Sequence, residues 1–116
     1  MNQKILLAED DKFLSIAMSD KLTREGFTVL HAVNGLEAVS VAKAEHPDLI
    51  LLDIIMPQKT GFEVLSELRL DQATRDIPVI VLSNLGQEAD IKKARDLGAI
   101  DYLVKSDVEM NMVLEK

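Results

Sequence analysis

Several polar residues of this sequence stand directly after short aliphatic runs, where their side chains could take part in chemistry. They are Glu9, Asp10, Asp11, Asp53, Ser83, Asn84 and Lys105. Carboxylates without a neighbouring His or Cys favour a hard cation such as Mg²⁺ or Mn²⁺ over zinc. A carboxylate can also act as a nucleophile, and phosphoryl transfer needs a nucleophile, a metal and groups that neutralise charge. These residue types therefore favour metal-dependent phosphoryl transfer, provided that the fold brings them together.

The elements that must position these residues alternate between two patterns. The nearly continuous aliphatic runs that predict buried strands are "KILLA" (4–8), "TVLHA" (28–32), "LILLD" (49–53), "PVIVLS" (78–83) and "DYLVK" (101–105). Amphipathic stretches that predict helices lie at 11–26, 34–47, 61–70, 89–98 and 107–116. Regular alternation of strand and helix predicts an α/β fold, with a parallel sheet covered by helices on both faces.

Right-handed crossovers leave few arrangements for five such units. One compact solution is a doubly wound, flavodoxin-like five-stranded parallel sheet with the strand order 2-1-3-4-5. Ligands bind such sheets beyond the carboxyl ends of the strands, where the winding reverses between the first and third strands. Glu9 and Asp10 follow the first predicted strand, and Asp53 ends the third. The fold therefore predicts that the carboxylates gather at one crevice.

Asp53 is the natural nucleophile of this set, because the aliphatic strand before it would hold its carboxylate at the floor of the crevice. Carboxylates about 4 Å apart repel by about 4 kcal/mol at an effective dielectric near 20, so a cluster of them should recruit a cation. Alone, Asp53 could equally cap the following turn. However, the ends of the neighbouring predicted strands carry Glu9, Asp10, Ser83 and Lys105. This coincidence favours Asp53 as a nucleophile over Asp53 as a cap. We expect Asp11 to begin the first helix, as a cap or as an acid of its first turn, rather than to bind metal.

Composition excludes several other classes of protein. The net charge of −7 argues against direct contact with nucleic acid, and the chain has no cysteine for a disulfide or thiolate site. No apolar run approaches the ~18 residues of a membrane span, and the N-terminus lacks the apolar stretch of a signal peptide. We therefore expect a cytoplasmic protein with no membrane partner. Hydrophobic residues make up 47% of the chain, which is enough for a folded core.

The whole chain resembles the receiver domain of two-component response regulators, of the chemotaxis-receiver type. The matching segments are "ILLAEDD" (5–11), "LILLDIIMPQKTGFEVL" (49–65), "IPVIVLS" (77–83) and "GAIDYLVK" (98–105). Together they contain an acidic pair, Asp-x-x-Met-Pro-x-x-x-Gly, a hydroxyl and a lysine, each after its own strand. The resemblance implies one receiver domain over 1–116, with a last helix so short that it suggests truncation.

The resemblance also implies a role for each matching residue. Asp53 would accept a phosphoryl group from a sensor histidine kinase or a phosphotransfer protein. Glu9, Asp10, Asp53 and the backbone carbonyl of Ile55 would bind Mg²⁺ or Mn²⁺. Such a domain is not an enzyme in the usual sense, since it catalyses only its own phosphorylation and dephosphorylation.

Further matching residues would sense the phosphate. Lys105 would pair with Asp53 and then with the phosphate, while Ser83 would donate a hydrogen bond to it. Tyr102 matches the switch aromatic of the family, so that phosphorylation would remodel the face built from the fourth helix, fifth strand and fifth helix. A half-buried core tyrosine is an equally good interpretation of Tyr102.

The sequence departs from the family pattern in ways that affect the chemistry. Asn84 stands where a small residue is usual, and its amide could shield the phosphate or bond to it. Ser106 replaces a common proline, so the direction of Lys105 stays open. Ile55 and Leu85 are apolar where polar residues often assist hydrolysis, which predicts slow self-dephosphorylation.

Alternative functions remain at this point. The same fold could serve as a pseudo-receiver, a protein-binding module that works without phosphorylation. A haloacid-dehalogenase-type phosphatase would need Asp-x-Asp, but Ile54 and Ile55 follow Asp53. The sequence does not identify a downstream protein or fused output domain, and it leaves open whether the domain forms a homodimer.

Overall fold

A computed structural model of the protein describes residues 3–54, 60–83 and 88–104. Its elements, in chain order, are β1 (Lys4–Ala8), α1 (Lys12–Arg24), β2 (Thr28–Ala32), α2 (Gly35–Glu45), β3 (Leu49–Leu52), α3 (Gly61–Leu70), β4 (Val79–Ser83), α4 (Glu88–Asp96) and β5 (Asp101–Val104). All neighbouring strands pair in parallel, in the order β2-β1-β3-β4-β5. The predicted doubly wound sheet is confirmed.

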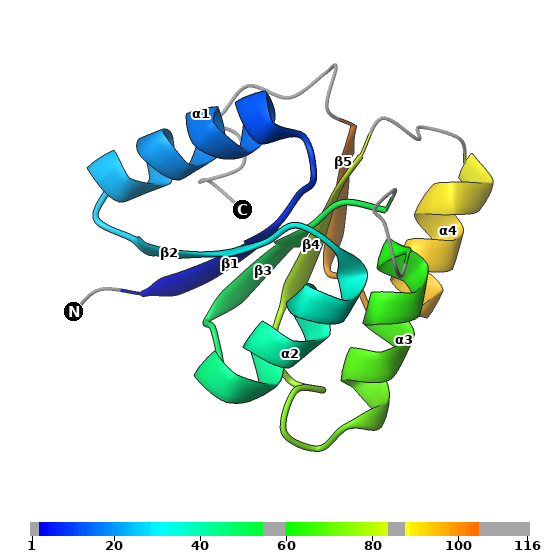
Figure 1. Ribbon diagram of the computed structural model, residues 1–116. Coiled ribbons are helices and arrows are strands. Elements are labelled where there is room, and N and C mark those ends of the chain that lie inside the picture. Colours follow the sequence, from blue (N-terminus) through cyan, green and yellow to red (C-terminus); the bar gives the residue numbers. More distant parts are fainter. Residues whose placement is uncertain (1–2, 55–59, 84–87, 105–116) are drawn as a thin grey trace.

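Successive side chains of a strand point to opposite faces of the sheet, and here each face has its own apolar cluster. In β1, Leu6 and Ala8 belong to the larger cluster, to which α2, α3 and α4 contribute side chains. Ile5 and Leu7 belong to the second cluster, together with Met18 and other residues of α1. Figure 1 shows α1 apart from the other three helices, across the sheet. The aliphatic runs are continuous because both faces of these strands are buried.

Polar side chains mark where three helices begin. The Asp11 carboxylate accepts a hydrogen bond from the Leu14 N–H at 3.1 Å, and Asn34 caps α2 in the same way. At α3, Thr60 and Glu63 form a reciprocal capping box. The prediction that Asp11 caps the first helix is therefore confirmed.

The first helix buries only one of its two apolar sets. Met18 and Leu22 are buried against the sheet, whereas Phe13 is 88% exposed and Ile16 is also largely exposed. Helical spacing by itself could not choose between these sets, because both repeat at three- and four-residue steps. The helix predicted at 107–116 lies outside the described residues.

Candidate metal and phosphoacceptor site

Asp53 is the residue that follows β3, and its backbone is tied to β1. Its N–H donates a hydrogen bond to the Ala8 carbonyl at 3.0 Å. In the parallel register Ala8 pairs with Leu52, so Glu9 and Asp53 are the next residues of two adjacent strands. Asp53 is only 5% exposed, although it is a carboxylate. The third strand thus ends one residue earlier than predicted and delivers Asp53 to the carboxyl edge of the sheet.

Glu9 and Asp10 occupy the turn between β1 and α1 and differ in burial. Glu9 is 2% exposed, its N–H donates to the Ala32 carbonyl at 3.0 Å, and its Oε1 accepts from the Asp11 N–H at 3.0 Å. The side chain of Asp10 is exposed. The backbone of this turn is therefore held on the β2 side and at the start of α1, while Asp10 faces solvent.

These three carboxylates form one acidic cluster. One carboxylate oxygen from each of Glu9, Asp10 and Asp53 lies within 4.8 Å of the other two. Three acidic groups this close repel one another, and a cation between them removes that cost. An all-oxygen set fits Mg²⁺ or Mn²⁺, and Mg²⁺ commonly takes one or two protein carboxylates and keeps other positions for water or phosphate oxygens. The cluster can thus hold a hard divalent cation beside the buried carboxylate of Asp53.

The other predicted site residues fall partly outside the structure. Ser83 is the last residue of β4 and pairs in register with Val104 of β5, so its backbone stands at the same edge of the sheet as Asp53. The predictions for the Ser83 hydroxyl, the Ile55 carbonyl, Asn84 and Lys105 concern parts that lie outside the described structure. Their roles stay predictions.

Tyr102 is part of the core rather than half-exposed. It is 8% exposed and belongs to the same apolar cluster as Ala94 and Ala99. In the register of β4 and β5 it pairs with Val81, two residues before Ser83. Its position agrees with a core residue close to the strand end that carries Ser83, and its role as a switch remains untested.

Arg69 is a structural residue that the sequence did not single out. Its guanidinium donates to the carbonyls of Arg75, Ile77 (3.2 Å) and Gly98 (2.9 Å). Burial lowers the pKa of Arg69, while the charge of Asp76 acts in the opposite direction. The side chain therefore ties the end of α3 to the loops before β4 and β5. No sequence signal marks it, because its acceptors are backbone groups.

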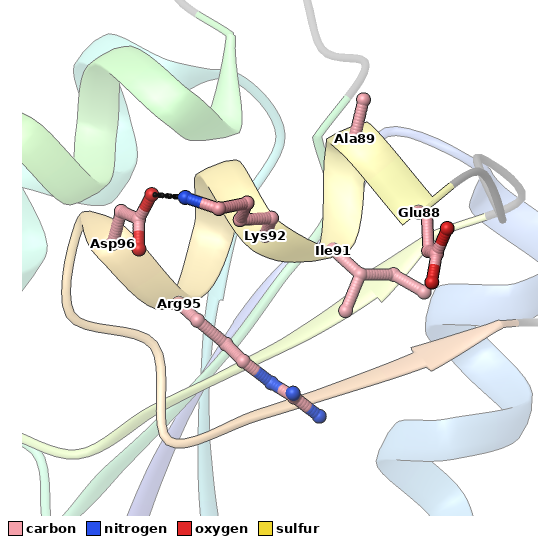
Figure 2. Close-up of a pocket in the computed structure, with 6 residues that line it drawn as sticks. All are labelled: Glu88, Ala89, Ile91, Lys92, Arg95 and Asp96. Atoms are coloured by element: carbon pink, nitrogen blue, oxygen red, sulfur yellow. Dashed lines mark hydrogen bonds and ion pairs between the residues drawn. The ribbon is translucent and has the colours of Figure 1, made fainter.

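A second surface feature lies on α4. A hollow of about 560 Å³ is lined by Glu88, Ala89, Ile91, Lys92, Arg95 and Asp96, whose side chains are drawn in Figure 2. Lys92 and Asp96 form an ion pair at 3.0 Å across one helical turn. On another side of the helix, the Lys93 ammonium lies 4.5 Å from the centre of the Phe62 ring, which joins α4 to α3. None of these residues belongs to the acidic cluster.

Comparison with known proteins agrees with this architecture. The family model described as the response regulator receiver domain matches residues 5–114. The chain is 43% identical over 107 residues to the DNA-binding dual master transcriptional regulator RpaA of Synechocystis sp., covering 91% of this chain and 44% of the relative.

Two solved structures resemble it throughout. One is the phosphorylated cyanobacterial phytochrome response regulator RcpA, with 33% identity, a TM-score of 0.84 and coverage of 99% of this chain and 88% of that one. The other is the Mn²⁺-bound form of response regulator Rcp1, with 31% identity, a TM-score of 0.86 and coverage of 97% and 90%.

The chain belongs to the family of response regulator receiver domains. It is thus a receiver domain of the kind found in two-component systems, which is a signalling domain rather than an enzyme in the usual sense. The chain spans about half the length of the curated relatives it matches. Within the described ranges, no helix is both long enough and apolar enough to cross a lipid bilayer.

Proposed function

We propose that this domain is a phosphorylation-activated switch whose phosphoacceptor is Asp53. The observation that carries the proposal is the convergence of Glu9, Asp10 and the buried Asp53 within 4.8 Å at the carboxyl edge of the sheet. The likeness to a phosphorylated and to a Mn²⁺-bound response regulator supports it. A pseudo-receiver would have no need of three clustered carboxylates, which repel one another.

In the proposed reaction, a carboxylate oxygen of Asp53 attacks the phosphorus of a phosphohistidine on a kinase or phosphotransfer protein. The N–P bond breaks as the O–P bond forms, and the histidine leaves with the electron pair of the broken bond. Glu9, Asp10, Asp53 and the Ile55 carbonyl would hold Mg²⁺ or Mn²⁺, which supplies positive charge to the phosphoryl oxygens. The burial of Asp53 keeps its carboxylate in one position for this attack.

The proposed roles of the remaining residues concern the phosphorylated state. The new group carries a charge of roughly −1.5 to −2. Lys105 would neutralise part of this charge, while Ser83 and Asn84 would donate hydrogen bonds. Movement of Ser83 would make room for Tyr102 and so change the face of α4 and β5. Hydrolysis would be slow, because Ile55 and Leu85 offer no polar group to orient water.

The proposed biological setting rests on membership of the receiver-domain family. The partner upstream is a histidine kinase or phosphotransfer protein, and the site of action is the cytoplasm. RpaA is described as DNA-binding, but this chain matches less than half of that protein. We propose that residues 1–116 form a single receiver domain that acts on a separate protein or a fused output domain. Its charge of −7 argues against direct contact with nucleic acid. A homodimer of this domain would use the face of α4 and the helix predicted at 107–116.

Intact-mass measurement tests the assignment of Asp53. The chain is treated with acetyl phosphate and Mg²⁺, and we expect one phosphoryl adduct on the wild type and none on Asp53→Asn. Asp20→Asn is a matched control, because Asp20 is an exposed acid paired with Arg24 on α1. It should keep the adduct. A wild type without an adduct would favour the pseudo-receiver, whereas an equal adduct on Asp53→Asn would show that another residue accepts the phosphoryl group.

A further inference from the structure

We propose that Gly61 is a positioning residue for Asp53: the missing side chain of Gly61 allows α3 to press against the Asp53 backbone and so sets the place of the nucleophile in the acidic cluster. The inference rests on the proposed function of that cluster. It assigns a role in the chemistry to a residue that carries no functional group.

The contact between Gly61 and the end of β3 is unusually close. The Gly61 N–H donates a hydrogen bond to the Ile54 carbonyl at 2.7 Å. A Cβ atom at Gly61 would lie 2.7 Å from the Ile54 Cα and 3.0 Å from the Ile54 Cδ1. It would lie nearer still to the backbone oxygen of Asp53, closer than real Cβ atoms come to any neighbour. Since two of these three neighbours are backbone atoms, they cannot rotate away.

Other contacts hold α3, the helix that begins at Gly61, in its position on the sheet. Its first turn is held by the capping box of Thr60 and Glu63, and Gly61 itself is buried. Val64, Leu65 and Leu68 are fully buried in the large apolar cluster, so any shift of α3 would open gaps there. An added methyl group would therefore push mainly on the Asp53–Ile54 peptide.

That peptide is also held from the other side. The Asp53 N–H donates to the Ala8 carbonyl of β1, next to Glu9. The Asp53 backbone is thus fastened to the strand that carries the other carboxylates and is limited by Gly61 on α3. A displacement of several tenths of an ångström would change the distances from Asp53 to Glu9 and Asp10 directly. Misplacement of a reacting group by about 1 Å can cost about 100-fold in rate.

The experiment compares Gly61→Ala with Gly26→Ala in the full chain. Gly26 has a positive φ of 97° but no atom within 4 Å of an added Cβ, so alanine there strains the backbone far from the cluster. We measure Mg²⁺ affinity by calorimetry, the rate of adduct formation with acetyl phosphate, and thermal stability. For Gly61→Ala we expect a dissociation constant for Mg²⁺ raised about 10-fold or more and a rate lowered about 10- to 100-fold.

Gly26→Ala separates positioning from general destabilisation. It should lower the melting temperature yet leave the Mg²⁺ affinity and the rate per folded molecule within about twofold of the wild type, since strain at Gly26 acts on stability alone. Unchanged affinity and rate in folded Gly61→Ala would overturn the inference. Equal losses in both variants would overturn it too, because they would reflect stability.

A second variant covers the case in which Gly61→Ala does not fold. Gly61→Ala combined with Ile54→Val removes the Cδ1 atom, the one side-chain neighbour, and keeps both backbone contacts. The loss of Mg²⁺ affinity should persist in it, and wild-type affinity there would refute the inference. A wild-type chain that neither binds Mg²⁺ nor gains an adduct would overturn the proposed function and this inference with it. A wild-type chain that binds Mg²⁺ and gains the adduct, together with Gly61→Ala variants that do so equally well, would overturn the role of Gly61 and leave the proposed function standing.

Discussion

Replacing Asp10 by asparagine should stabilise the metal-free domain and at the same time remove most of its response to Mg²⁺. The change keeps the size of the side chain and removes one of the three negative charges of the acidic cluster. Asp10 is the suitable member to change because its side chain is exposed. Glu9 and Asp53 are buried and hydrogen-bonded, and replacing either would also alter packing.

The size of the effect follows from the geometry. The chosen oxygens lie no more than 4.8 Å apart, and two unit charges at that distance repel by about 3.5 kcal/mol at a dielectric of about 20 and by about 1 kcal/mol in water. The exposure of Asp10 favours the lower value for each of its two neighbours. We expect Asp10→Asn to raise the free energy of unfolding by about 1–2 kcal/mol without metal. At a Mg²⁺ concentration of 100 times its dissociation constant, the wild type should gain about 2.7 kcal/mol.

Urea unfolding followed by far-ultraviolet circular dichroism measures both effects, and it suits a chain without tryptophan. The wild type, Asp10→Asn and the control Asp20→Asn are unfolded near pH 7, once in a chelator and once in Mg²⁺. The variant should be the more stable protein in the chelator and the less responsive one in Mg²⁺, while Asp20→Asn should respond like the wild type. An Asp10→Asn protein that is less stable than the wild type in the chelator, or that gains as much from Mg²⁺, would refute the electrostatic argument.

Two further predictions concern stability away from the cluster. Arg69→Ala should lower the free energy of unfolding by about 1–2 kcal/mol, because it leaves the carbonyls of Ile77 and Gly98 without their charged donor. Arg69→Lys should restore only part of this lost stability, since an ammonium group lacks the planar fork of the guanidinium. Equal stability of the Lys variant and the wild type in urea would contradict this. The Ala73 N–H, which bonds to the Asp71 carboxylate, and Lys43 together hold the pKa of Asp71 below its usual value of 3.8. A lowered folded pKa means that the ionised group stabilises the fold above about pH 4 and that this contribution is lost as pH falls through the folded pKa. Asp71→Asn should therefore be less stable than the wild type at pH 7 and approach it in acid, and a difference that grew on acidification would disprove the assignment.

The apolar strand before Asp53 also supports the acidic cluster. Residues Leu49–Leu52 form β3, in the centre of the sheet between β1 and β4. Ile50, Leu51 and Leu52 are almost completely buried, which gives Asp53 a rigid support. In the proposed reaction, Asp53 would gain from such support, because less motion has to be frozen when its carboxylate attacks phosphorus. The burial of the strand and the position of the acid are therefore parts of one arrangement.

Sequence periodicity was sufficient to predict the order of the strands in the sheet and the position of the acidic cluster. Continuous aliphatic runs separated by amphipathic stretches admit few parallel topologies, and the observed order follows the one predicted. In a parallel sheet the carboxyl ends of adjacent strands share one edge, so the residues after β1 and β3 had to be neighbours. The convergence of Glu9, Asp10 and Asp53 was thus predictable without coordinates.

Tertiary packing decided which face of α1 is buried and which contacts Arg69 and Gly61 make, and periodicity predicts neither. The two apolar sets of α1 have the same helical spacing, and only contact with the sheet buries Met18 while leaving Phe13 exposed. The contacts of Arg69 and Gly61 were not predicted, because Arg69 bonds to backbone carbonyls distant in the sequence and the close approach at Gly61 depends on the absence of a side chain. Such contacts depend on the distance between elements, which the order of residues does not encode locally. The sequence by itself determined which groups meet at the edge of the sheet, and only the tertiary structure decided how closely α3 packs against the backbone of Asp53 and Ile54.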